Sequence, residues 1–527
     1  MLPPRATRYP NLAVKFLILR LVARAPDRPE MTGLSAEKFD VLVIGGGITG
    51  CGVARDASMR GLRVALVERD DFASGTSGRS SRLIHGGIRY LEHGQLHLVR
   101  ESIHERQTLL RIAPHLVQPL PFTWPIYRGA RIGKWTLRAG LLAYDLMAGR
   151  RSRRHHSLDA AETLEREPCL ARDGLTSGAV YYDARTDDAR LTVANAVAAV
   201  DAGATALSHT RVTEIIRSSG KAVGAVAEAK YSGEKREIRA RAIVNATGVW
   251  INDFRTDEHG RHRGSKGAHI AVPSERVGNR DALTLISPID GRIMFCLPAG
   301  SQTIIGTTDT WTDESPETVH ASTSDVDYLV RSANRYFPEA RLDRDDVVSA
   351  WAGIRPLASG GTDSPSAVSR EHSIVIDSGG MINVTGGKLT TFRSMAAEVV
   401  DVVQHALGQR RTKAATDSVD LPGSERANEI ARLEREDPQL SRVLVQGLPY
   451  TGAHLAYGIA KEMALTLSDL LIRRTHLAFE TRDHGKSAAP TAADIVAPLL
   501  GWSAQMKSDR LREFETDIAR MFAIGED

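Results

Sequence analysis

The chain has 527 residues, of which 42% are hydrophobic and 25% charged, and its formal net charge is +4. This length is too great for one hydrophobic core and predicts about three domains, and the weak net charge excludes a general nucleic-acid-binding polycation. Cys51, Cys169 and Cys296 are too far apart for a zinc motif or a disulfide scaffold, which favours a reducing compartment. The sequence contains no apolar run of about 18 residues, so it predicts no membrane-spanning helix.

Residues 1–38 form an N-terminal extension ahead of the first segment with a folded pattern. The stretch NLAVKFLILRLVA, residues 11–23, is apolar but is interrupted by Lys15 and Arg20, unlike the continuous apolar region of a secretory signal. Two interpretations stay open. The extension is either a basic organelle-targeting peptide, or untranslated sequence upstream of a true start at Met31.

Residues 39–71, FDVLVIGGGITGCGVARDASMRGLRVALVERDD, predict a strand, a glycine turn, a helix and a second strand. The run VLVI is typical of a parallel strand that is buried on both faces. In the turn, Gly45 permits a tight bend, Gly47 lets the backbone approach a pyrophosphate, and Gly50 lets the helix pack on the strand. Glu68 ends the second strand and can accept hydrogen bonds from ribose hydroxyls. The unit therefore predicts a site for FAD or NAD.

Three later segments favour FAD over NAD. An NAD enzyme usually continues into another helix–strand repeat, whereas residues 77–94, SGRSSRLIHGGIRYLEHG, form a loop of small and cationic residues. Residues 240–253 predict an apolar strand that ends in Ala-Thr-Gly, where the backbone can approach an adenosine. In residues 381–401, Gly386 and Gly387 precede an alanine-rich helix, whose N-terminus can face an electron-rich ring.

A basic segment lies at residues 127–156. It carries eight Lys or Arg residues against a single acidic residue, Asp145, and Trp135, Leu142 and Leu146 follow helical spacing. Such a basic amphipathic helix can lie on an anionic lipid surface. The alternative is a helix that faces the core and has a solvated, charged end.

The predicted fold class is α/β: a Rossmann-like FAD-binding domain with an inserted β-sheet substrate domain and a helical C-terminal domain. A hinge is expected at residues 418–428, where Pro422 and Gly423 break regular structure. The predicted division assigns 39–110, 185–250 and 345–405 to a discontinuous FAD-binding domain, 111–184 and 251–344 to a substrate-binding or cap domain, and 420–527 to the helical domain.

Seven motifs occur in order: GGGITG, SGTSGRSSRLIHGGIRYLE, IVNATGVW, SKGAHI, IIGTTDT, WAGIRPL and VTGGKLTTFR. Together they resemble the FAD-dependent glycerol-3-phosphate dehydrogenase family, the respiratory type that reduces quinone. The resemblance covers residues 38–400 and continues more loosely around MALTLSDLLIRRTHL, residues 463–477. HGGIRYLE and GGKLTTFR are specific to it, whereas many flavoproteins share GGGITG.

The resemblance implies FAD-dependent oxidation of sn-glycerol 3-phosphate at C2 to dihydroxyacetone phosphate. A hydride passes to flavin N5, and the electrons then pass to ubiquinone or menaquinone. The expected location is cytoplasmic, peripherally attached to the inner face of the cytoplasmic membrane, with no nucleic-acid partner and with a homodimer allowed. The alternatives are a glycerol-3-phosphate oxidase that uses oxygen, a related FAD-dependent amino- or hydroxy-acid oxidase, and a non-catalytic redox-sensing module.

By the same resemblance, four residues bind the substrate phosphate: Arg89, Tyr90, Arg370 and Lys388. Guanidinium groups match phosphate oxygens bidentately, although any one arginine taken alone is more often part of a surface salt bridge. Arg355 in WAGIRPL is expected nearer the reacting carbon, where its positive charge stabilises a developing alkoxide.

His269 in SKGAHIAVP is the candidate base, because a neutral imidazole can accept a proton near pH 7. His85 is the competitor, but its place in the small-residue loop favours a flavin contact. Asp309 ends the strand IIGTTDT and is expected near the flavin, although it can equally be a simple cap. No metal site is predicted. The residues expected to contact FAD are Gly45, Gly47, Gly50, Glu68, Thr76, Ser77, Ser81, His85, Gly86, Gly87, Ala246, Thr247, Gly248, Asp309, Gly353, Gly386, Gly387, Lys388 and Leu389.

Overall fold

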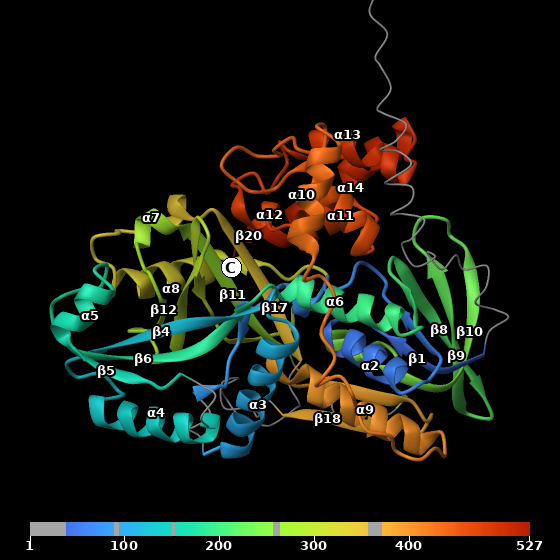
Figure 1. Cartoon of the computed structure of the whole chain (residues 1–527), viewed down its shortest axis with the longest axis horizontal. Helices are drawn as coiled ribbons and strands as arrows, with labels where there is room; N and C mark the ends of the chain where they lie inside the picture. Colours follow the sequence, from blue (N-terminus) through green and yellow to red (C-terminus); the bar gives the residue numbers. More distant parts are fainter. Residues whose placement is uncertain (1–37, 89–93, 150–152, 257–263, 357–370, 527) are drawn as a thin grey trace, which may run out of the picture.

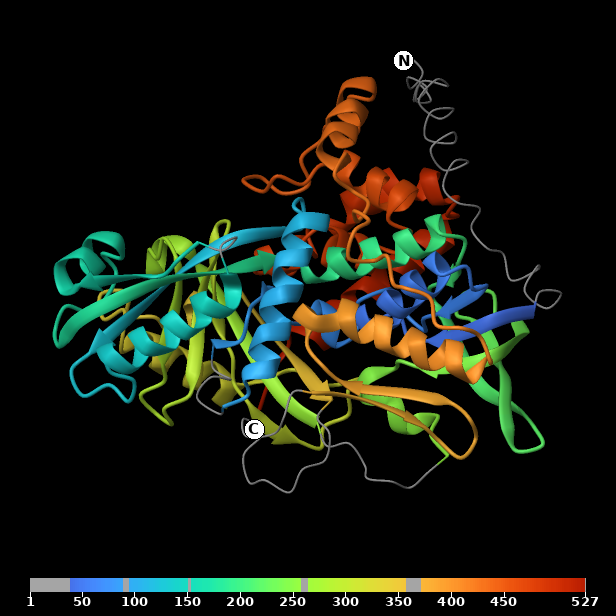
Figure 2. The ribbon, with the colours of Figure 1, turned by 60° about the horizontal axis from the view of Figure 1, so that its bottom comes forward.

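The computed structural model describes residues 38–88, 94–149, 153–256, 264–356 and 371–526. Over these residues the chain forms two large β-sheets that lie side by side, and a helical C-terminal region covers their junction (Figures 1 and 2). The mixed α/β architecture and the helical C-terminal region confirm the predicted fold class.

The first sheet, sheet A, has eight strands. Its main path runs β18 (His372–Ile376), β19 (Ile382–Gly386), β10 (Lys235–Asn245), β1 (Lys38–Ile44), β2 (Val64–Val67) and β7 (Thr205–Leu207), and β10 also pairs with the hairpin β9 (Lys221–Ala229) and β8 (Thr210–Ser218). The strands from β19 to β7 are parallel. Their carboxyl ends therefore meet at one edge of the sheet, where open α/β sheets bind their ligands.

Both faces of sheet A are covered, which explains the continuous apolar run VLVI in β1. Val41 and Val43 pack in one cluster with three helices, and Leu42 and Ile44 pack in another with the β8–β9 hairpin. Alternate side chains of a strand point to opposite faces, so a strand buried on both faces shows no polar alternation. The three helices are α2 (Ile48–Met59), α6 (Asp188–Asp201) and α9 (Phe392–Ala406).

The second sheet, sheet B, has ten strands, most of them antiparallel. Its path is β15 (Thr310–Thr312), β11 (Gly264–Pro273), β14 (Gln302–Gly306), β13 (Ile293–Ala299), β12 (Ala282–Ile286), β4 (Val117–Tyr127), β6 (Leu175–Thr186) and β3 (Leu83–Ile84), with β17 (Ser349–Pro356) beside β11 and β5 (His156–Asp159) beside β6. One face packs against α8 (Thr323–Asn334), and the other packs against α4 (Lys134–Ala148) and the C-terminal helices. The remaining helices outside the C-terminal region are α3 (Leu96–Ile112), α5 (Ala160–Arg166) and α7 (Ser274–Val277).

Strand β17 does not follow the predicted division of the chain. Residues 345–405 were assigned wholly to the FAD-binding domain, but β17 pairs with β11 from Ser349 to Pro356 and so belongs to sheet B. Both faces of β17 are buried, since Trp351 packs in one cluster and Ile354 in another. A strand without polar alternation gives no sequence signal of which sheet it joins.

The C-terminal region is helical, as predicted, and its first helix begins at Arg426, within the expected hinge segment. Its elements are α10 (Arg426–Glu436), α11 (Gly452–Lys461), the π-helical turn η9 (Asp469–Arg474), α12 (Leu477–Glu480), α13 (Ala489–Leu500) and α14 (Ala504–Phe522). A short strand, β20 (Ile524–Gly525), pairs with β16 (Ala321–Ser322) and ties the end of this region to sheet B's neighbour α8. Over the described residues, every helix is too short or too polar to cross a membrane.

Candidate active site

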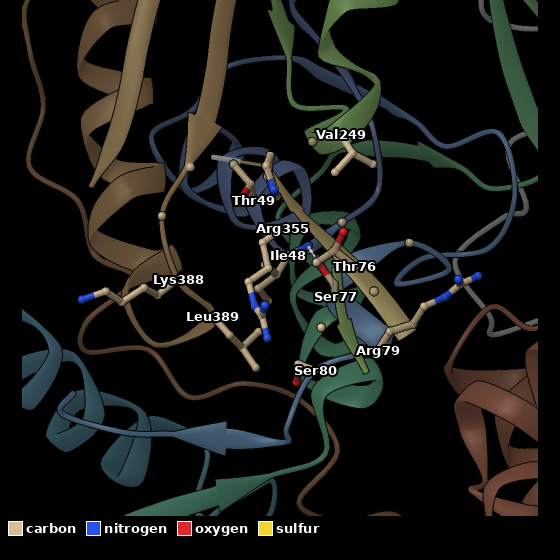
Figure 3. A pocket seen from close by; sticks show the side chains of 18 of the residues that line it. Ile48, Thr49, Thr76, Ser77, Arg79, Ser80, Val249, Arg355, Lys388 and Leu389 are labelled. Atoms are coloured by element: carbon tan, nitrogen blue, oxygen red, sulfur yellow. Dashed lines mark hydrogen bonds between the residues drawn. The ribbon is translucent and has the colours of Figure 1, made fainter. Parts of the chain in front are cut away.

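A cavity of about 420 Å³ lies between the carboxyl edge of sheet A and one face of sheet B (Figure 3). Sheet A contributes the loops that follow β1, β2, β10 and β19. Sheet B contributes side chains from β4, β6, β11, β13 and β17, on the face that points away from α8. The cavity therefore collects segments that are separated by more than 300 residues in the sequence.

The turn between β1 and α2 is made of glycines because there is no room for side chains. Gly45 has a φ of +105°, and a Cβ atom there would lie 2.6 Å from the carbonyl oxygen of Ala246. A Cβ atom on Gly50 would lie 1.8 Å from the carbonyl oxygen of Gly45. These two glycines let the β1 turn, the β10 loop and α2 touch one another, as the sequence pattern predicts.

The N-terminus of α2 faces the cavity. Gly47 caps the helix and lines the cavity, and the backbone N–H of Ile48 donates to the Ser77 hydroxyl at 2.9 Å. The Thr76 hydroxyl, next to it in the small-residue loop, donates to the carbonyl of Ile354 at 2.7 Å. A helix N-terminus beside two hydroxyl groups is the arrangement that binds a pyrophosphate.

Glu68 lies at the end of β2 and is held by backbone donors. Its carboxylate accepts hydrogen bonds from the N–H groups of Gly46, at 2.6 Å, and Asp70, at 2.9 Å. Burial raises the pKa of Glu68, and the two backbone donors oppose that rise. The carboxylate lines the cavity in a fixed orientation, where it can accept further hydrogen bonds from sugar hydroxyls.

A cation–aromatic pair closes the same end of the cavity. The Arg69 guanidinium lies 4.3 Å from the centre of the Trp250 ring, and Glu317 bonds to both residues. The Trp250 Nε1–H donates to Glu317 at 2.6 Å, and Arg69 lies 2.8 Å from the same carboxylate oxygen. The pair presents a flat, polarised wall beside Glu68.

His269 lies in β11 and is almost fully buried, with 2% of its surface exposed. Its Nε2 is 2.8 Å from the Ser81 hydroxyl, and its ring stacks on Trp351 with centroids 5.3 Å apart and planes at 12°. Burial, together with the charges of Arg355 and Arg82, lowers the pKa of His269 to about 3. The imidazole is therefore neutral across the physiological range.

Arg355 in β17 projects into the cavity and is held by three acceptors. Its guanidinium lies 3.1 Å from the Asp309 carboxylate, 3.0 Å from the Thr307 hydroxyl and 3.4 Å from the Ser265 hydroxyl. A Cβ atom on Gly267, which faces it across the sheet, would lie 2.2 Å from a guanidinium nitrogen. The positive charge is thus fixed in position before any ligand binds.

The loop after β19 brings a second pair of glycines to the cavity. Gly386 and Gly387 have φ angles of +73° and +82°, and both line the cavity with Lys388. The Lys388 ammonium lies 3.3 Å from the Ser102 hydroxyl on α3, and Figure 3 shows its side chain turned away from Arg355. The structure therefore brings His269 and Arg355 together but directs Lys388 to another side of the cavity.

Comparisons with known proteins agree with this geometry. The family described as "FAD dependent oxidoreductase" matches residues 40–400, and the "C-terminal domain of alpha-glycerophosphate oxidase" matches residues 422–507. "Glycerol-3-phosphate dehydrogenase 2" of Mycobacterium tuberculosis is 36% identical over 93% of this chain and 89% of its own length. The chain belongs to the FAD-dependent glycerol-3-phosphate dehydrogenase family.

Two solved structures resemble the fold. The glycerol-3-phosphate dehydrogenase of Bacillus halodurans, complexed with FAD, has a TM-score of 0.76 and 31% identity, and the match covers 94% of this chain and 98% of that one. The L-alpha-glycerophosphate oxidase of Mycoplasma pneumoniae, with FAD bound, has a TM-score of 0.58 and 18% identity, and the match covers 73% of this chain and all of that one. The second likeness shows the fold alone. The cofactor of the family is FAD, which confirms the prediction made from the loops.

The cavity fits that cofactor, because it combines a helix N-terminus, a fixed carboxylate and glycine loops without room for side chains. It is lined by nineteen of the residues singled out from the sequence: Gly45, Gly47, Glu68, Thr76, Ser77, Ser81, His85, Gly87, Ala246, Thr247, Gly248, His269, Asp309, Gly353, Arg355, Gly386, Gly387, Lys388 and Leu389. Their individual contacts with FAD or substrate stay predictions.

Five candidates are not part of this lining. Arg89, Tyr90 and Arg370 lie outside the described residues. Gly50 and Gly86, within them, lie behind the cavity wall. Gly50 is a packing position under the turn. Gly86 is another, since a Cβ atom there would lie 2.0 Å from the hydroxyl oxygen of a neighbouring tyrosine on α4.

Several lining residues were not singled out from the sequence. Trp250 lies inside the quoted motif IVNATGVW and Gly267 inside SKGAHI, so both had a signal that went unused. Ser80 also had a sequence signal, because it lies in the small-residue loop. Arg69 and Arg292 had none, because single arginines at strand ends are common.

Proposed function

We propose that this protein oxidises sn-glycerol 3-phosphate at C2 to dihydroxyacetone phosphate and passes the electrons to a membrane quinone, ubiquinone or menaquinone. The observation that carries the proposal is the pairing of a neutral, buried imidazole with a fixed guanidinium in one cavity, at His269 and Arg355. The names of relatives that match over nine-tenths of the chain support the substrate.

Two residues of the chain would act on the substrate, each in a different role. His269 would take the proton of the C2 hydroxyl through Nε2, which already shares a hydrogen bond with the Ser81 hydroxyl in this cavity. Arg355 would stabilise the negative charge that develops on that oxygen, since Asp309 and Thr307 already hold it in place. FAD, when bound, supplies a ring that accepts the hydride at N5.

The substrate phosphate would bind cations around this centre. We keep Arg89, Tyr90, Arg370 and Lys388 as the proposed phosphate site. Of these, the Lys388 ammonium lies 3.3 Å from the Ser102 hydroxyl on α3. A doubly negative phosphate needs several such donors, and guanidinium groups offer them in pairs.

The test is anaerobic reduction of the purified flavoprotein. Glycerol 3-phosphate should bleach the flavin absorption at a ratio of one substrate to one flavin, and a soluble quinone analogue should restore the colour. A protein that binds FAD but is not bleached by glycerol 3-phosphate would contradict the proposed substrate. Bleaching without reoxidation by quinone would contradict the proposed acceptor.

An oxidase that passes the electrons to oxygen is the second candidate. The observation that favours it is the match of residues 422–507 to the C-terminal domain of alpha-glycerophosphate oxidase. The same cavity serves both reactions, so the acceptor decides between them. Oxygen uptake with stoichiometric peroxide at a rate equal to quinone reduction would establish the oxidase.

Attachment to a membrane is the second part of the proposal, and α4 is the surface that supports it. Trp135, Leu142 and Leu146 are 73%, 55% and 75% exposed along one side of this helix, while Leu141 and Tyr144 are buried on the other. The sequence of the same segment, residues 127–156, carries eight Lys or Arg residues, which favours an anionic lipid surface.

Sedimentation with vesicles of anionic lipid tests this attachment. Leu146→Ser should reduce the bound fraction severalfold, because it removes apolar area from the lipid-facing side. Ile289→Ser is the matched control, since Ile289 is an exposed aliphatic residue too, at 50%, but lies in the turn between β12 and β13. Equal losses in the two variants, or no binding by the unaltered chain, would contradict the role of α4.

A further inference from the structure

One segment of the C-terminal region, residues 469–480, packs against residues that form the candidate active site. It consists of η9, a short link and α12. It contacts a loop, residues 71–82, whose middle part lines the cavity and whose end overlaps the small-residue segment 77–94. It also contacts sheet B beside His269. The C-terminal region therefore lies against both walls of the site, although it lines little of the cavity itself.

The first contact fixes the start of the loop. Arg474 donates to both carboxylate oxygens of Asp71, at 2.6 and 2.8 Å, and Arg473 donates to one of them at 2.5 Å. Asp71 and Arg474 are fully buried. A bidentate pair without water around it holds its two partners in one geometry.

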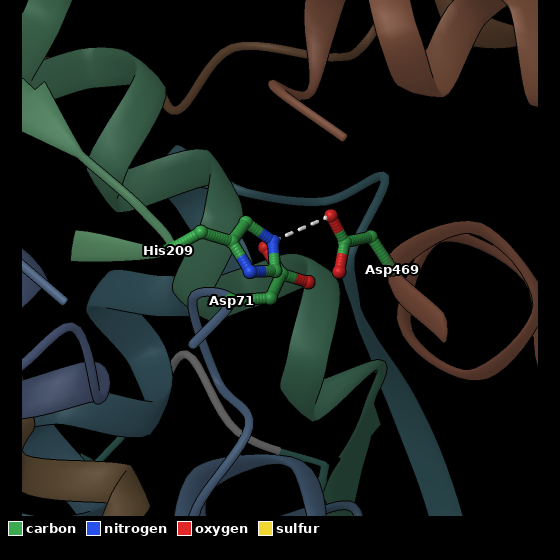
Figure 4. Close-up of side chains that lie close together, drawn as sticks. All are labelled: Asp71, His209 and Asp469. Atoms are coloured by element: carbon green, nitrogen blue, oxygen red, sulfur yellow. Dashed lines mark hydrogen bonds and ion pairs between the residues drawn. The ribbon is translucent and has the colours of Figure 1, made fainter. Parts of the chain in front are cut away.

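The carboxylates next to this contact form an ion-pair network rather than a cation site (Figure 4). Asp71, His209 and Asp469 lie close enough to share a metal, but the arginines of η9 already bond to both carboxylates. Burial alone would raise the pKa of Asp469, yet the charges of His209 and Arg473 hold it well below its usual range. The network therefore strengthens the anchor of the loop.

The second contact reaches His269 through aromatic rings. The edge of the Phe479 ring meets Trp351, with centroids 5.1 Å apart and planes at 89°, and Trp351 stacks on His269. The Phe479 carbonyl also accepts hydrogen bonds from Ser349, at 2.8 Å, and Gln302, at 3.2 Å, in two strands of sheet B. Phe479 is thus fixed at both its ring and its backbone.

The third contact involves Arg82, at the end of the loop. Its guanidinium lies 4.6 Å from the centre of the Phe479 ring and 5.7 Å from that of Trp351. Arg82, in the loop, and Arg355, in β17, are the two cations whose charges reach His269, and Ser81 is its hydrogen-bond partner. The two rings therefore set how near one of these cations can come to the imidazole.

We propose that Phe479 is a positioning residue for His269, acting through Trp351 and Arg82. The inference rests on the proposed function, because it concerns the residue that would accept the substrate proton. Without the Phe479 ring, Trp351 would tilt, Arg82 would move from its place, and water would reach the imidazole. Each change makes protonation of His269 easier, so the residue would lose its activity as a base first at acid pH.

The experiment compares Phe479→Leu with Phe522→Leu in the full-length flavoprotein. Phe522 is buried and its ring meets the Phe479 ring, with centroids 4.9 Å apart, so the control removes an equal ring from the same cluster. Turnover with glycerol 3-phosphate is measured from pH 8 down to the lowest pH at which the protein keeps its flavin, and the titration of His269 is followed by NMR in the oxidised protein over the same range.

Phe479→Leu should raise the pKa of His269 by at least one unit, and the pH below which kcat falls should rise by the same amount, with KM and FAD content within a factor of two. Phe522→Leu should leave both the titration and the pH profile as in the unaltered chain. If the leucine variant does not fold, Phe479→Met, which fills the space with a flexible side chain, carries the same expectations.

A titration of His269 that is the same in both variants would overturn the inference. The NMR measurement does not depend on turnover, so it separates this result from a failure of the proposed function. If glycerol 3-phosphate reduces no flavin in the unaltered chain, the reaction is wrong, but the shift of the His269 pKa still decides the role of Phe479.

Discussion

The two walls of the cavity are built from different chemical groups. Sheet A offers mainly backbone: the glycine turn after β1, the start of α2, the Ala-Thr-Gly segment and the Gly386-Gly387 pair. Sheet B offers mainly side chains, among them His269 and Arg355. The first wall recognises a ligand by letting it approach closely, and the second acts on a ligand through charge and proton affinity.

This difference separates binding from reaction within one site. A wall of backbone has few groups that change protonation, so it serves a cofactor that remains in place. A wall of preorganised charges is needed where bonds change, because that is where negative charge develops. Changes in sheet A should therefore affect mainly FAD content, and changes in sheet B should affect mainly turnover.

Gly50→Ala should have the largest effect of all, and on FAD binding. Its Cβ atom would lie 1.8 Å from the carbonyl oxygen of Gly45, so α2 would have to move away from β1. Such overpacking costs about 3 kcal/mol, and the displaced helix start would no longer meet the pyrophosphate. We expect the purified variant to retain less than a tenth of the flavin, measured by absorbance.

The control for this change is Gly140→Ala on α4. A Cβ atom there meets nothing within 4 Å, and alanine favours a helix over glycine by roughly 1 kcal/mol. Full flavin content and a slightly raised Tm are expected. Normal flavin content in Gly50→Ala would show that FAD binding tolerates a side chain at this position, contrary to what the geometry of the backbone wall indicates.

Arg355→Ala should have the next largest effect, and on turnover. The variant removes a charge that Asp309 and Thr307 hold toward the cavity, and the loss of one preorganised donor costs about 100-fold in kcat. The flavin content should remain, since Arg355 belongs to the sheet B wall. Steady-state kinetics on flavin-normalised protein measures both.

Arg344→Ala is the control for charge removal at a distance. Arg344 forms a bidentate pair with Asp327 on the surface, at 2.6 Å for each bond. Kinetics equal to those of the unaltered chain are expected there. A colourless Arg355→Ala protein would contradict the division between a binding wall and a reacting wall.

A pH-dependent difference in stability is the third expected effect. The pKa of His269 is lowered to about 3 in the folded chain and is about 6.5 in an unfolded one, so only the unfolded state gains a proton between these values. The contribution of His269 to the free energy of unfolding is complete above pH 6.5. It falls as the pH falls, by at most about 1.4 kcal/mol per pH unit.

Urea unfolding at pH 7.5 and pH 5.0 measures this contribution by difference. His269→Gln should lose less stability between the two pH values than the unaltered chain, because glutamine does not titrate. Ser81→Ala keeps the imidazole and should retain the larger loss. Equal losses in the unaltered chain and in His269→Gln would mean that the imidazole is not buried as the structure has it.

The same difference between the walls decides what the sequence could predict. The residues of the backbone wall belong to local sequence motifs, because a glycine turn, its helix and its carboxylate lie within thirty residues. Gly45, Gly47 and Glu68 were therefore found directly from spacing. The fold class followed from the same local patterns, since periodicity and turn residues are local properties.

The side-chain wall depends on which distant strands become neighbours, and spacing does not encode that. His269 and Arg355 were named through the family resemblance, and the pairing of β11 with β17 that joins them came only from the structure. The link from Phe479 to His269 crosses two hundred residues and passes through Trp351, the first residue of the motif WAGIRPL, which gives no sign of a contact with Phe479. Contacts of this kind are tertiary and have no local signal.

Trp250→Leu should have the smallest effect and tests an aromatic residue of the sheet A wall. Leucine removes the ring over which Arg69 lies and the Nε1–H that bonds to Glu317. A cation–aromatic contact of this exposure contributes about 1 kcal/mol, so the dissociation constant of FAD should rise about fivefold with kcat unchanged. Fluorescence titration of the apoprotein with FAD measures it, and Trp502→Leu in the C-terminal region is the control. A large fall in kcat without a change in FAD affinity would move Trp250 to the reacting side and break the separation of the two walls.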